Sequence, residues 1–250
     1  MMKFRVYRAG RNGTDTRYEL YEVDPQPGMS VLEALFEIQE KYDDGLAFRY
    51  SCRGAVCGSC AMTINREPRL ACRTQLANMA FEKPLALKMF PALTKEVQWN
   101  KSEEVLIEPL PNLPVLKDLI VDMDPFFEVY RNIKPWLEQA EHETAPSKMS
   151  TEEVIRLDKY ANCILCAACY ASCPVNEKNR VYLGPAALSW AWRFIDDPRT
   201  GDKDERLGLA SGNNGAPACE FAYNCVKVCP REVAPASAIR SIRTLLRSSQ

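Results

Sequence analysis

The chain has 250 residues, a formal net charge of −1 and 46% hydrophobic residues. This length suits one or two domains, and the near-zero charge gives no reason to expect a nucleic-acid partner. No run approaches the roughly 18 consecutive apolar residues of a membrane span. The first residues follow a strand pattern and not that of an apolar signal core, so we expect a protein of the cytosol or of the cytosolic side of a membrane.

The N-terminal half alternates apolar and polar residues in a way that predicts a small sheet with one helix. Strands are expected at residues 3–8, 18–23, 61–64, 70–73 and 105–108. The polar stretch 9–16 reads as a hairpin loop between the first two strands. Ser30 is the expected N-cap of a helix that runs to about Tyr42, because Glu33 stands at the capping-box distance from it. This order of elements is typical of a β-grasp domain.

The proline-rich stretch 108–114 cannot be a helix interior and is expected to link two domains, residues 1–114 and 115–250. Beyond it, helical patterns dominate. Helices are expected at residues 116–123, 126–133, 151–160, 184–194 and 235–247, with loops at 141–150 and 196–217. The sequence therefore predicts an α+β protein whose second domain is all α. Residues 78–103 are expected to form a surface hairpin, to which no function is assigned.

The chain has 11 cysteines, and all of them fall into three spaced sets. The plant-type set, with the spacing C-x4-C-x2-C…C, consists of Cys52, Cys57, Cys60 and Cys72. The second run, with the spacing C-x2-C-x2-C-x3-C before a proline, consists of Cys163, Cys166, Cys169 and Cys173. The third run repeats that spacing with Cys219, Cys225 and Cys229, but Ala222 replaces its second cysteine. The first spacing is that of plant-type [2Fe–2S] proteins and the second that of bacterial ferredoxins.

Disulfide bonds and zinc sites account for these cysteines less well than iron–sulfur clusters do. Disulfides are disfavoured because the number of cysteines is odd and no export signal is apparent. Zinc remains an alternative because C-x2-C pairs suit it, yet zinc sites close with four ligands from two such pairs. We therefore favour iron–sulfur clusters. In the loop of the plant-type set, Gly54 and Gly58 are expected to supply positive φ angles for close backbone approach.

In two-cluster ferredoxins the first three cysteines of a run hold one cluster, and the fourth crosses to the other. By this rule a [4Fe–4S] cluster is expected on Cys163, Cys166, Cys169 and Cys229. The second cluster receives Cys173, Cys219 and Cys225, and Ala222 leaves its fourth corner without a donor. A [3Fe–4S] cluster is predicted there. The alternative is a four-iron cluster with an oxygen ligand from Glu220.

Five segments carry a resemblance to a known family. They are 50–60 (YSCRGAVCGSC), 110–123 (LPNLPVLKDLIVDM), 163–169 (CILCAAC), 182–187 (YLGPAA) and 225–230 (CVKVCP). The sequence resembles the iron–sulfur subunits of succinate dehydrogenase and fumarate reductase over nearly its whole length. The resemblance implies a β-grasp [2Fe–2S] ferredoxin domain followed by a helical two-cluster ferredoxin domain. It also implies an electron-transfer role, with no binding of the dicarboxylate and no catalytic residue in this chain.

The same resemblance implies partners and a location. The partners would be a flavoprotein subunit with covalent FAD, one or more membrane anchor subunits, and a quinone. The chain would lie peripherally on the cytoplasmic face of a prokaryotic cell membrane, bound through the anchor. The residues implied near the quinone are Pro174, Glu220, Ala222 and Arg243. The chain lacks the tryptophan pair and histidine of the enzymes that use ubiquinone, so menaquinone is the expected quinone.

Two competing functions stay open at this point. One is a relay for a different flavoprotein, with no quinone involved. The other is a free three-cluster ferredoxin, although such a carrier would not need the helices expected at 116–160 and 235–247. A role near the quinone is also not the only interpretation of Arg243. It shares the expected helix with Arg240 and Arg247, so the alternative is an exposed arginine without a specific role.

Overall fold

The computed structural model describes residues 1–79, 85–89, 93, 97–139 and 148–248. Its N-terminal half contains a five-stranded sheet with the strand order β2-β1-β5-β3-β4. The strands are β1 (Met2–Arg8), β2 (Arg17–Val23), β3 (Ala61–Ile64), β4 (Glu67–Leu70) and β5 (Glu104–Glu108). β1 pairs antiparallel with β2 and parallel with β5, which in turn pairs antiparallel with β3. A short 3-10 turn, η1 (Arg11–Gly13), lies in the loop between β1 and β2.

Helix α1 (Val31–Lys41) packs against this sheet and begins as predicted, because the Ser30 side chain accepts from the Glu33 backbone and the Glu33 side chain accepts in return. Its apolar residues join the sheet residues in one core. The short helix α2 (Leu76–Met79) follows β4. The predicted order of two strands, a helix and further strands is confirmed. Only β4 differs in position, because it covers Glu67–Leu70 where residues 70–73 were expected.

The prediction of a helix at residues 116–123 is wrong. The chain forms instead a two-stranded hairpin of β6 (Val115–Lys117) and β7 (Ile120–Val121). The turn is held by Asp118, which is 1% exposed and accepts from the Ala9 and Ala47 backbone N–H groups, each at 2.9 Å, and from Arg8 Nε at 3.1 Å. These distant partners override the local helical pattern and hold the hairpin on the N-terminal domain. The predicted division at residue 114 stays a prediction.

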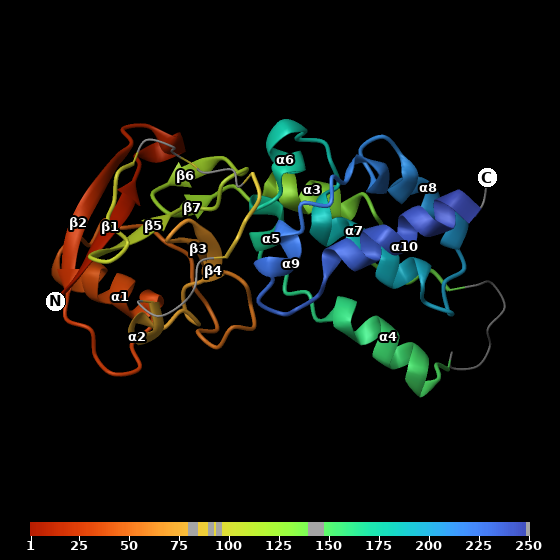
Figure 1. Ribbon diagram of the computed structural model, residues 1–250, viewed down its shortest axis with the longest axis horizontal. Helices are drawn as coiled ribbons and strands as arrows, with labels where there is room; N and C mark the ends of the chain where they lie inside the picture. The colour runs from red at the N-terminus through yellow and green to blue at the C-terminus, as the bar shows by residue number, and fades with distance from the viewer. Residues whose placement is uncertain (80–84, 90–92, 94–96, 140–147, 249–250) are drawn as a thin grey trace.

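The C-terminal half is helical (Figure 1). Its helices are α3 (Asp124–Arg131), α4 (Thr151–Ala161), α5 (Ala168–Ala171), α6 (Pro174–Lys178), α7 (Gly184–Ile195), α8 (Lys203–Ser211), α9 (Asn224–Lys227) and α10 (Pro235–Ser248), with a 3-10 turn η2 (Ala216–Ala218). The helices predicted at 126–133, 151–160, 184–194 and 235–247 are confirmed, with ends shifted by a few residues. The loop expected at 141–150 and the surface hairpin expected at 78–103 lie partly outside the described residues. The described residues of 78–103 form no strand; residues 78–79 belong to α2, and β5 begins only at Glu104.

The expected loop at 196–217 is partly wrong because it contains α8 and η2. Arg206 on α8 is 1% exposed, which the charge-rich sequence did not suggest. Its guanidinium donates to Asp202 at 2.6 Å and to the carbonyl of Trp136 at 2.7 Å. A polar residue thus fixes this helix against the chain near Trp136, where an apolar face would normally be expected.

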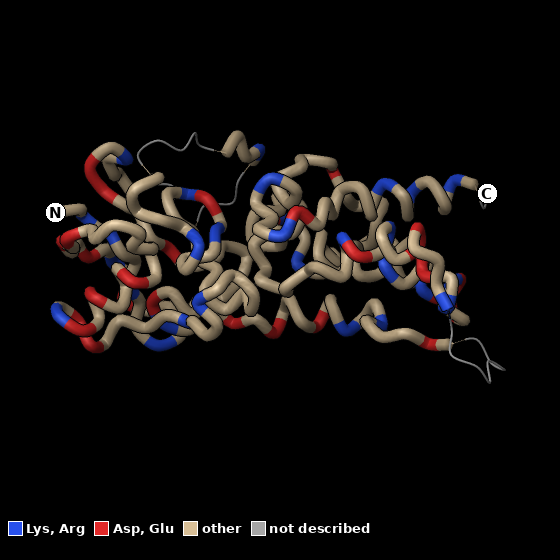
Figure 2. The backbone as a smooth tube through the Cα atoms, turned by 90° about the horizontal axis from the view of Figure 1, so that it is seen from below, with Lys and Arg blue, Asp and Glu red and all other residues tan. Residues whose placement is uncertain are grey.

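The molecule is elongated, with the sheet domain at one end, the helical domain at the other, and the two termini far apart (Figure 1). α7 and α10 pack against each other in the centre of the helical domain. Acidic and basic residues are interspersed over both domains (Figure 2). None of the described helices combines the length and the apolar character that crossing a membrane requires.

Candidate metal centres

The loop of the plant-type set turns its backbone N–H groups toward sulfur. Gly54, Val56 and Cys57 donate to Cys52 Sγ, at 3.4, 3.3 and 3.3 Å. This requires sharp turns, and the residues at positive φ are Arg53 (55°), Ala55 (58°) and Gly58 (75°). The expectation for Gly58 is confirmed and that for Gly54 is wrong, since the left-handed turns fall on its two neighbours instead.

The other two thiols of this set close the site from the sheet side. Burial raises the pKa of Cys60 to about 12, and Cys72 lies close enough to contribute to that shift. Burial alone would raise the pKa of Cys57, but hydrogen bonds from Ser59 and Cys52 lower it to about 6. All four sulfurs of the plant-type set therefore gather at one place, between the loop and the turn that follows β4.

Gly58 also marks the contact between this loop and the second run. A Cβ atom on Gly58 would lie 2.8 Å from the Ile164 carbonyl oxygen and 2.9 Å from Cys166 Cβ. No side chain fits in that space. The two cysteine loops, which are about a hundred residues apart in sequence, therefore touch backbone to backbone.

The second and third runs have the same backbone conformation. Leu165 and Phe221, each two residues after the first cysteine of its run, both have a φ of 52°. Ala167 and Tyr223, each four residues after it, have φ angles of 60° and 61°. Ala222 therefore occupies in the third run the place that Cys166 occupies in the second.

The structure groups the cysteines of these runs across the repeat. One cavity, here the four-cysteine cavity, is lined by Cys163, Cys166, Cys169 and Cys229. Burial raises the pKa of Cys166 to about 12 and that of Cys169 well above its ordinary value. Thiols so far from water ionise only if a cation compensates the charge, as iron would.

The other cavity, here the three-cysteine cavity, is lined by Cys173, Cys219 and Cys225 together with Pro174, Glu220 and Ala222. Burial raises the pKa of Cys173 to about 11 and that of Cys225 to about 12. The two cavities are neighbours, because Cys225 contributes to the raised pKa of Cys169.

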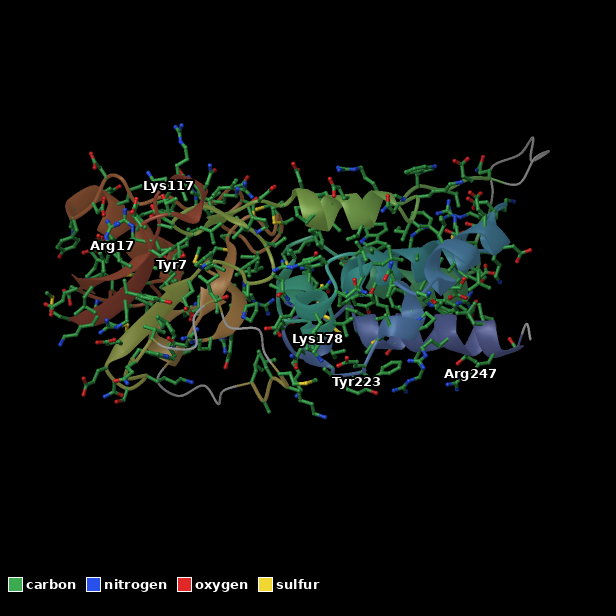
Figure 3. All side chains as sticks on the ribbon, turned by 90° about the horizontal axis from the view of Figure 1, so that it is seen from above. Tyr7, Arg17, Lys117, Lys178, Tyr223 and Arg247 are labelled. Carbon is green, nitrogen blue, oxygen red and sulfur yellow. The ribbon has the colours of Figure 1, made fainter. Side chains whose placement is uncertain are left out.

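The residues implied near a quinone surround this same cavity. Pro174 is buried at the start of α6, whereas the exposed Glu220 forms an ion pair with Lys178 at 3.5 Å. Arg243 does not line the cavity, but it donates to the Cys219 carbonyl at 3.2 Å and its guanidinium lies 5.2 Å from the centre of the Phe221 ring. Figure 3 places Lys178 and Tyr223 on the same side of the helical domain.

The donor set fits clusters better than single ions. Among the described residues, no three cysteine, histidine or acidic side chains converge closely enough to hold one metal ion. Zinc needs such convergence, with Zn–S distances of about 2.3 Å. Thiols spread around a cavity suit a cluster that occupies the space between them, so the residues present fit iron–sulfur clusters.

Two buried donors near the cavities were not foreseen from the sequence. Within the described part of the chain, the Tyr182 hydroxyl and the Trp190 indole nitrogen are buried without a hydrogen-bond partner. Tyr182 lines the three-cysteine cavity, and Trp190 lies near Cys163, where it lowers the pKa of that thiol against the larger rise caused by burial. Nothing in the sequence marks these two aromatic residues, since a residue's position in the chain does not show what its side chain faces.

Known protein families match both cysteine-containing halves of the chain. A family model described as a 2Fe-2S iron-sulfur cluster binding domain matches residues 3–128, and a 4Fe-4S dicluster domain matches residues 155–230. The fumarate reductase iron-sulfur subunit of Haemophilus influenzae is 34% identical over 88% of this chain and 82% of its own length. The succinate dehydrogenase iron-sulfur subunit of Coxiella burnetii is 37% identical over 89% of this chain and 86% of its own.

The chain belongs to this family of iron–sulfur subunits. A mitochondrial member from Oryza sativa, a succinate dehydrogenase [ubiquinone] iron-sulfur subunit, is 36% identical over 97% of this chain and 74% of its own length. A chain in the solved Mycobacterium smegmatis Sdh1 complex in the apo form matches with a TM-score of 0.81 and 25% identity, over 100% of this chain and 96% of that one. The expected fold class, a sheet-containing [2Fe–2S] domain before a mostly helical two-cluster domain, is confirmed.

Proposed function

We propose that this chain is the electron-transfer subunit of a membrane-bound succinate:quinone oxidoreductase. It relays single electrons between the FAD of a flavoprotein subunit and a quinone. The observation that carries the proposal is the arrangement of cysteines in three adjoining groups, one of which lacks its fourth thiol. Iron–sulfur clusters, when bound, take up and release one electron at a time.

The cysteines have distinct assignments. The plant-type set, Cys52, Cys57, Cys60 and Cys72, holds a [2Fe–2S] cluster. The four-cysteine cavity holds a [4Fe–4S] cluster through Cys163, Cys166, Cys169 and Cys229. The three-cysteine cavity holds a [3Fe–4S] cluster through Cys173, Cys219 and Cys225.

Two features favour the three-iron assignment over a four-iron cluster with an oxygen ligand. Ala222 stands at the position of Cys166 in the repeated backbone, and its methyl group offers no donor atom. Glu220, the candidate oxygen ligand, has a side chain that is 45% exposed and paired with Lys178. A carboxylate engaged in this way at the surface is a poor replacement for a buried thiolate.

The protein residues control access and charge at these sites. Backbone N–H groups donate to Cys52 Sγ and so stabilise negative charge on that sulfur. The contact at Gly58 keeps the path from the first loop to the second run short. Buried apolar residues on α7 and α10 keep water away from the three-cysteine cavity. The quinone is assigned to the surroundings of that cavity, near Pro174, Glu220, Ala222 and Arg243, and is menaquinone.

The partners are a flavoprotein subunit with covalent FAD and one or more membrane anchor subunits, which hold the chain peripherally on the cytoplasmic face of a prokaryotic cell membrane. The names of relatives from both succinate dehydrogenases and fumarate reductases support this assignment.

The test is purification of the native complex from membranes, followed by an EPR redox titration with succinate as reductant. We expect a flavoprotein and an anchor to copurify, and three centres of the assigned types to respond. A soluble chain without partners would favour a free ferredoxin instead. Mössbauer spectra of anaerobically prepared protein that show two four-iron clusters would contradict the [3Fe–4S] assignment.

A further inference from the structure

Tyr182 is a buried polar residue that the proposed function does not yet use. It lies between α6 and α7, is 0% exposed, and its hydroxyl has no hydrogen-bond partner among the residues that the structure describes. A buried hydroxyl normally finds a partner, because leaving it unpaired costs the hydration that it loses on folding. An unpaired buried donor in a native structure therefore points to a group that is not among the protein atoms.

The backbone around Tyr182 is fixed on both sides. Tyr182 N donates to the Asn179 carbonyl at 3.2 Å, and the Tyr182 carbonyl accepts from Asn176 Nδ2 at the same distance. The next residue, Leu183, donates to the Asn214 carbonyl at 2.9 Å. The backbone at Tyr182 is thus fixed, and its ring is packed in the core of the helical domain.

The acceptor lies in the three-cysteine cavity, which Tyr182 lines together with Cys173, Cys219 and Cys225. Cys219 Sγ accepts no hydrogen bond from this hydroxyl, so the expected acceptor is a sulfide that a bound cluster would bring into the cavity.

We propose that the Tyr182 hydroxyl donates a hydrogen bond to a cluster sulfide beside Cys219 in the three-cysteine centre, and thereby raises the reduction potential of that centre. The inference rests on the proposed function, which places a [3Fe–4S] cluster in this cavity. Reduction adds one electron and one unit of negative charge to the cluster, while no bond is broken. A donor to sulfur stabilises the reduced state more than the oxidised state, because the reduced state carries more negative charge.

The variant Tyr182→Phe tests this proposal, because it removes one oxygen and retains the ring. In the assembled complex we expect reduction of the [3Fe–4S] centre to become about tenfold less favourable, which for a one-electron couple is a midpoint about 59 mV more negative. The midpoints of the [2Fe–2S] and [4Fe–4S] centres, measured in the same EPR titration, should stay unchanged. In the wild type, an exchangeable proton coupled to the three-iron centre should be visible by pulsed EPR after transfer to D₂O, and the variant should lack it.

Tyr170→Phe is the matched control. Tyr170 is 1% exposed and its hydroxyl is likewise buried without a partner in the described structure, but it lines neither cavity. We expect this variant to leave the midpoint of the three-iron centre where it is in the wild type.

The outcomes separate the inference about Tyr182 from the proposed function. If the wild type shows the [3Fe–4S] signal and Tyr182→Phe shifts neither its midpoint nor its proton coupling, the inference is wrong while the proposed function stands. If all three midpoints move together, or Tyr170→Phe gives the same shift, the effect is one of general packing and the inference is again wrong. If the wild type shows no [3Fe–4S] signal, the proposed centre itself is overturned, and the inference with it.

Discussion

At position 222 a methyl group stands where the second run has a thiol. The backbone around it repeats that of Cys166, with left-handed residues at matching places before and after it. The difference between the two sites therefore lies in one side chain and not in the loop. This makes the residue open to a direct chemical test.

We expect Ala222→Cys to supply the missing ligand and convert the proposed [3Fe–4S] centre into a [4Fe–4S] centre. An added thiolate brings negative charge, so the centre should become at least about tenfold harder to reduce, or about 59 mV lower in potential. Mössbauer spectroscopy counts the irons, and EPR titration gives the midpoint. Ala222→Val, which adds volume without a donor, should keep three irons. Retention of three irons in the cysteine variant would show that position 222 does not face the open corner.

Asp197 is a residue whose charge is needed for stability. Its side chain is 0% exposed and pairs with Arg193 at 2.9 Å and Arg199 at 2.7 Å. Burial alone would raise its pKa, but hydrogen bonds and charge from Arg199 and Arg193 hold that pKa below its ordinary value. Because the folded pKa is depressed, the ion pairs stabilise the fold above the unfolded pKa of about 3.9 and lose their effect as the pH falls through the folded value.

The variant Asp197→Asn should therefore destabilise the protein by roughly 3 kcal/mol at pH 7, since it leaves two partly buried arginines without their partner. The difference from the wild type should be the same at pH 5 and pH 7. Thermal unfolding at a fixed scan rate, followed by circular dichroism, measures it. Asp196→Asn is the control, because Asp196 pairs with Arg156, whose side chain is 49% exposed, and such surface pairs contribute about 0–1 kcal/mol. Equal losses in the two variants would contradict the role of burial.

At the scale of elements, the plant-type loop and the second run depend on one glycine for their contact. Gly58 has a φ of 75°, and a Cβ there would lie 2.8 Å from the Ile164 carbonyl oxygen. Gly54 lies in the same loop, has its φ outside the left-handed range, and would place a Cβ no nearer than 3.7 Å from another atom, the Cys52 carbonyl oxygen. The two glycines thus lie in the same loop, but only Gly58 has a positive φ and lacks room for a Cβ atom.

We expect Gly58→Ala to push the two loops apart and to slow electron transfer between the [2Fe–2S] and [4Fe–4S] centres. The left-handed backbone alone should cost roughly 1–2 kcal/mol for an alanine. Freeze-quench EPR of the complex mixed with succinate measures the order and rate of reduction. Gly54→Ala should behave as the wild type. If both variants transfer electrons at the wild-type rate, the contact at Gly58 does not limit the path.

Elements with strong local signals could be predicted, and elements that depend on distant partners could not. The capping box of α1, with Ser30 and Glu33, and the strand alternation of β1 and β2 act within a few residues, so they are visible in the sequence. The hairpin of β6 and β7 depends on Asp118, whose partners are Arg8, Ala9 and Ala47. No periodicity over residues 116–123 contains that information.

On the scale of the whole molecule, buried asparagines hold the two halves together. Asn112 donates from Nδ2 to the carbonyls of Ala171 and Cys173, both at 3.1 Å. Asn224, 1% exposed on α9, donates to the Ser172 carbonyl at 2.9 Å and to the Lys88 carbonyl at 2.6 Å. It also accepts from Lys88 N at 2.7 Å. A segment that follows β4 is in this way fixed beside the three-cysteine cavity.

The variant Asn224→Ala should cost about 1–3 kcal/mol, because it leaves the buried carbonyl of Ser172 and the part-buried backbone groups of Lys88 without these partners. We expect a lower thermal unfolding midpoint and faster hydrogen exchange at residues 85–89, which exchange mass spectrometry can locate. Asn132→Ala, at the exposed end of α3, is the control and should change neither. Unchanged exchange at residues 85–89 in the Asn224 variant would show that this segment is held by other contacts.

By itself the sequence determined the proposed chemistry: the number of cysteines, their spacing and the alanine at position 222 predict three clusters and their types, because ligand spacing is a local property of the chain. The structure lines one cavity with Cys229 and three cysteines of the second run, and the assignment of a cluster to these four stays a prediction. Only the tertiary structure decided that the first two cysteine loops meet at Gly58, that a hairpin replaces the expected helix, and that Tyr182 faces the three-cysteine cavity. Each of these depends on residues far apart in the sequence, and what a buried side chain faces is settled by packing and not by its own neighbours in the chain.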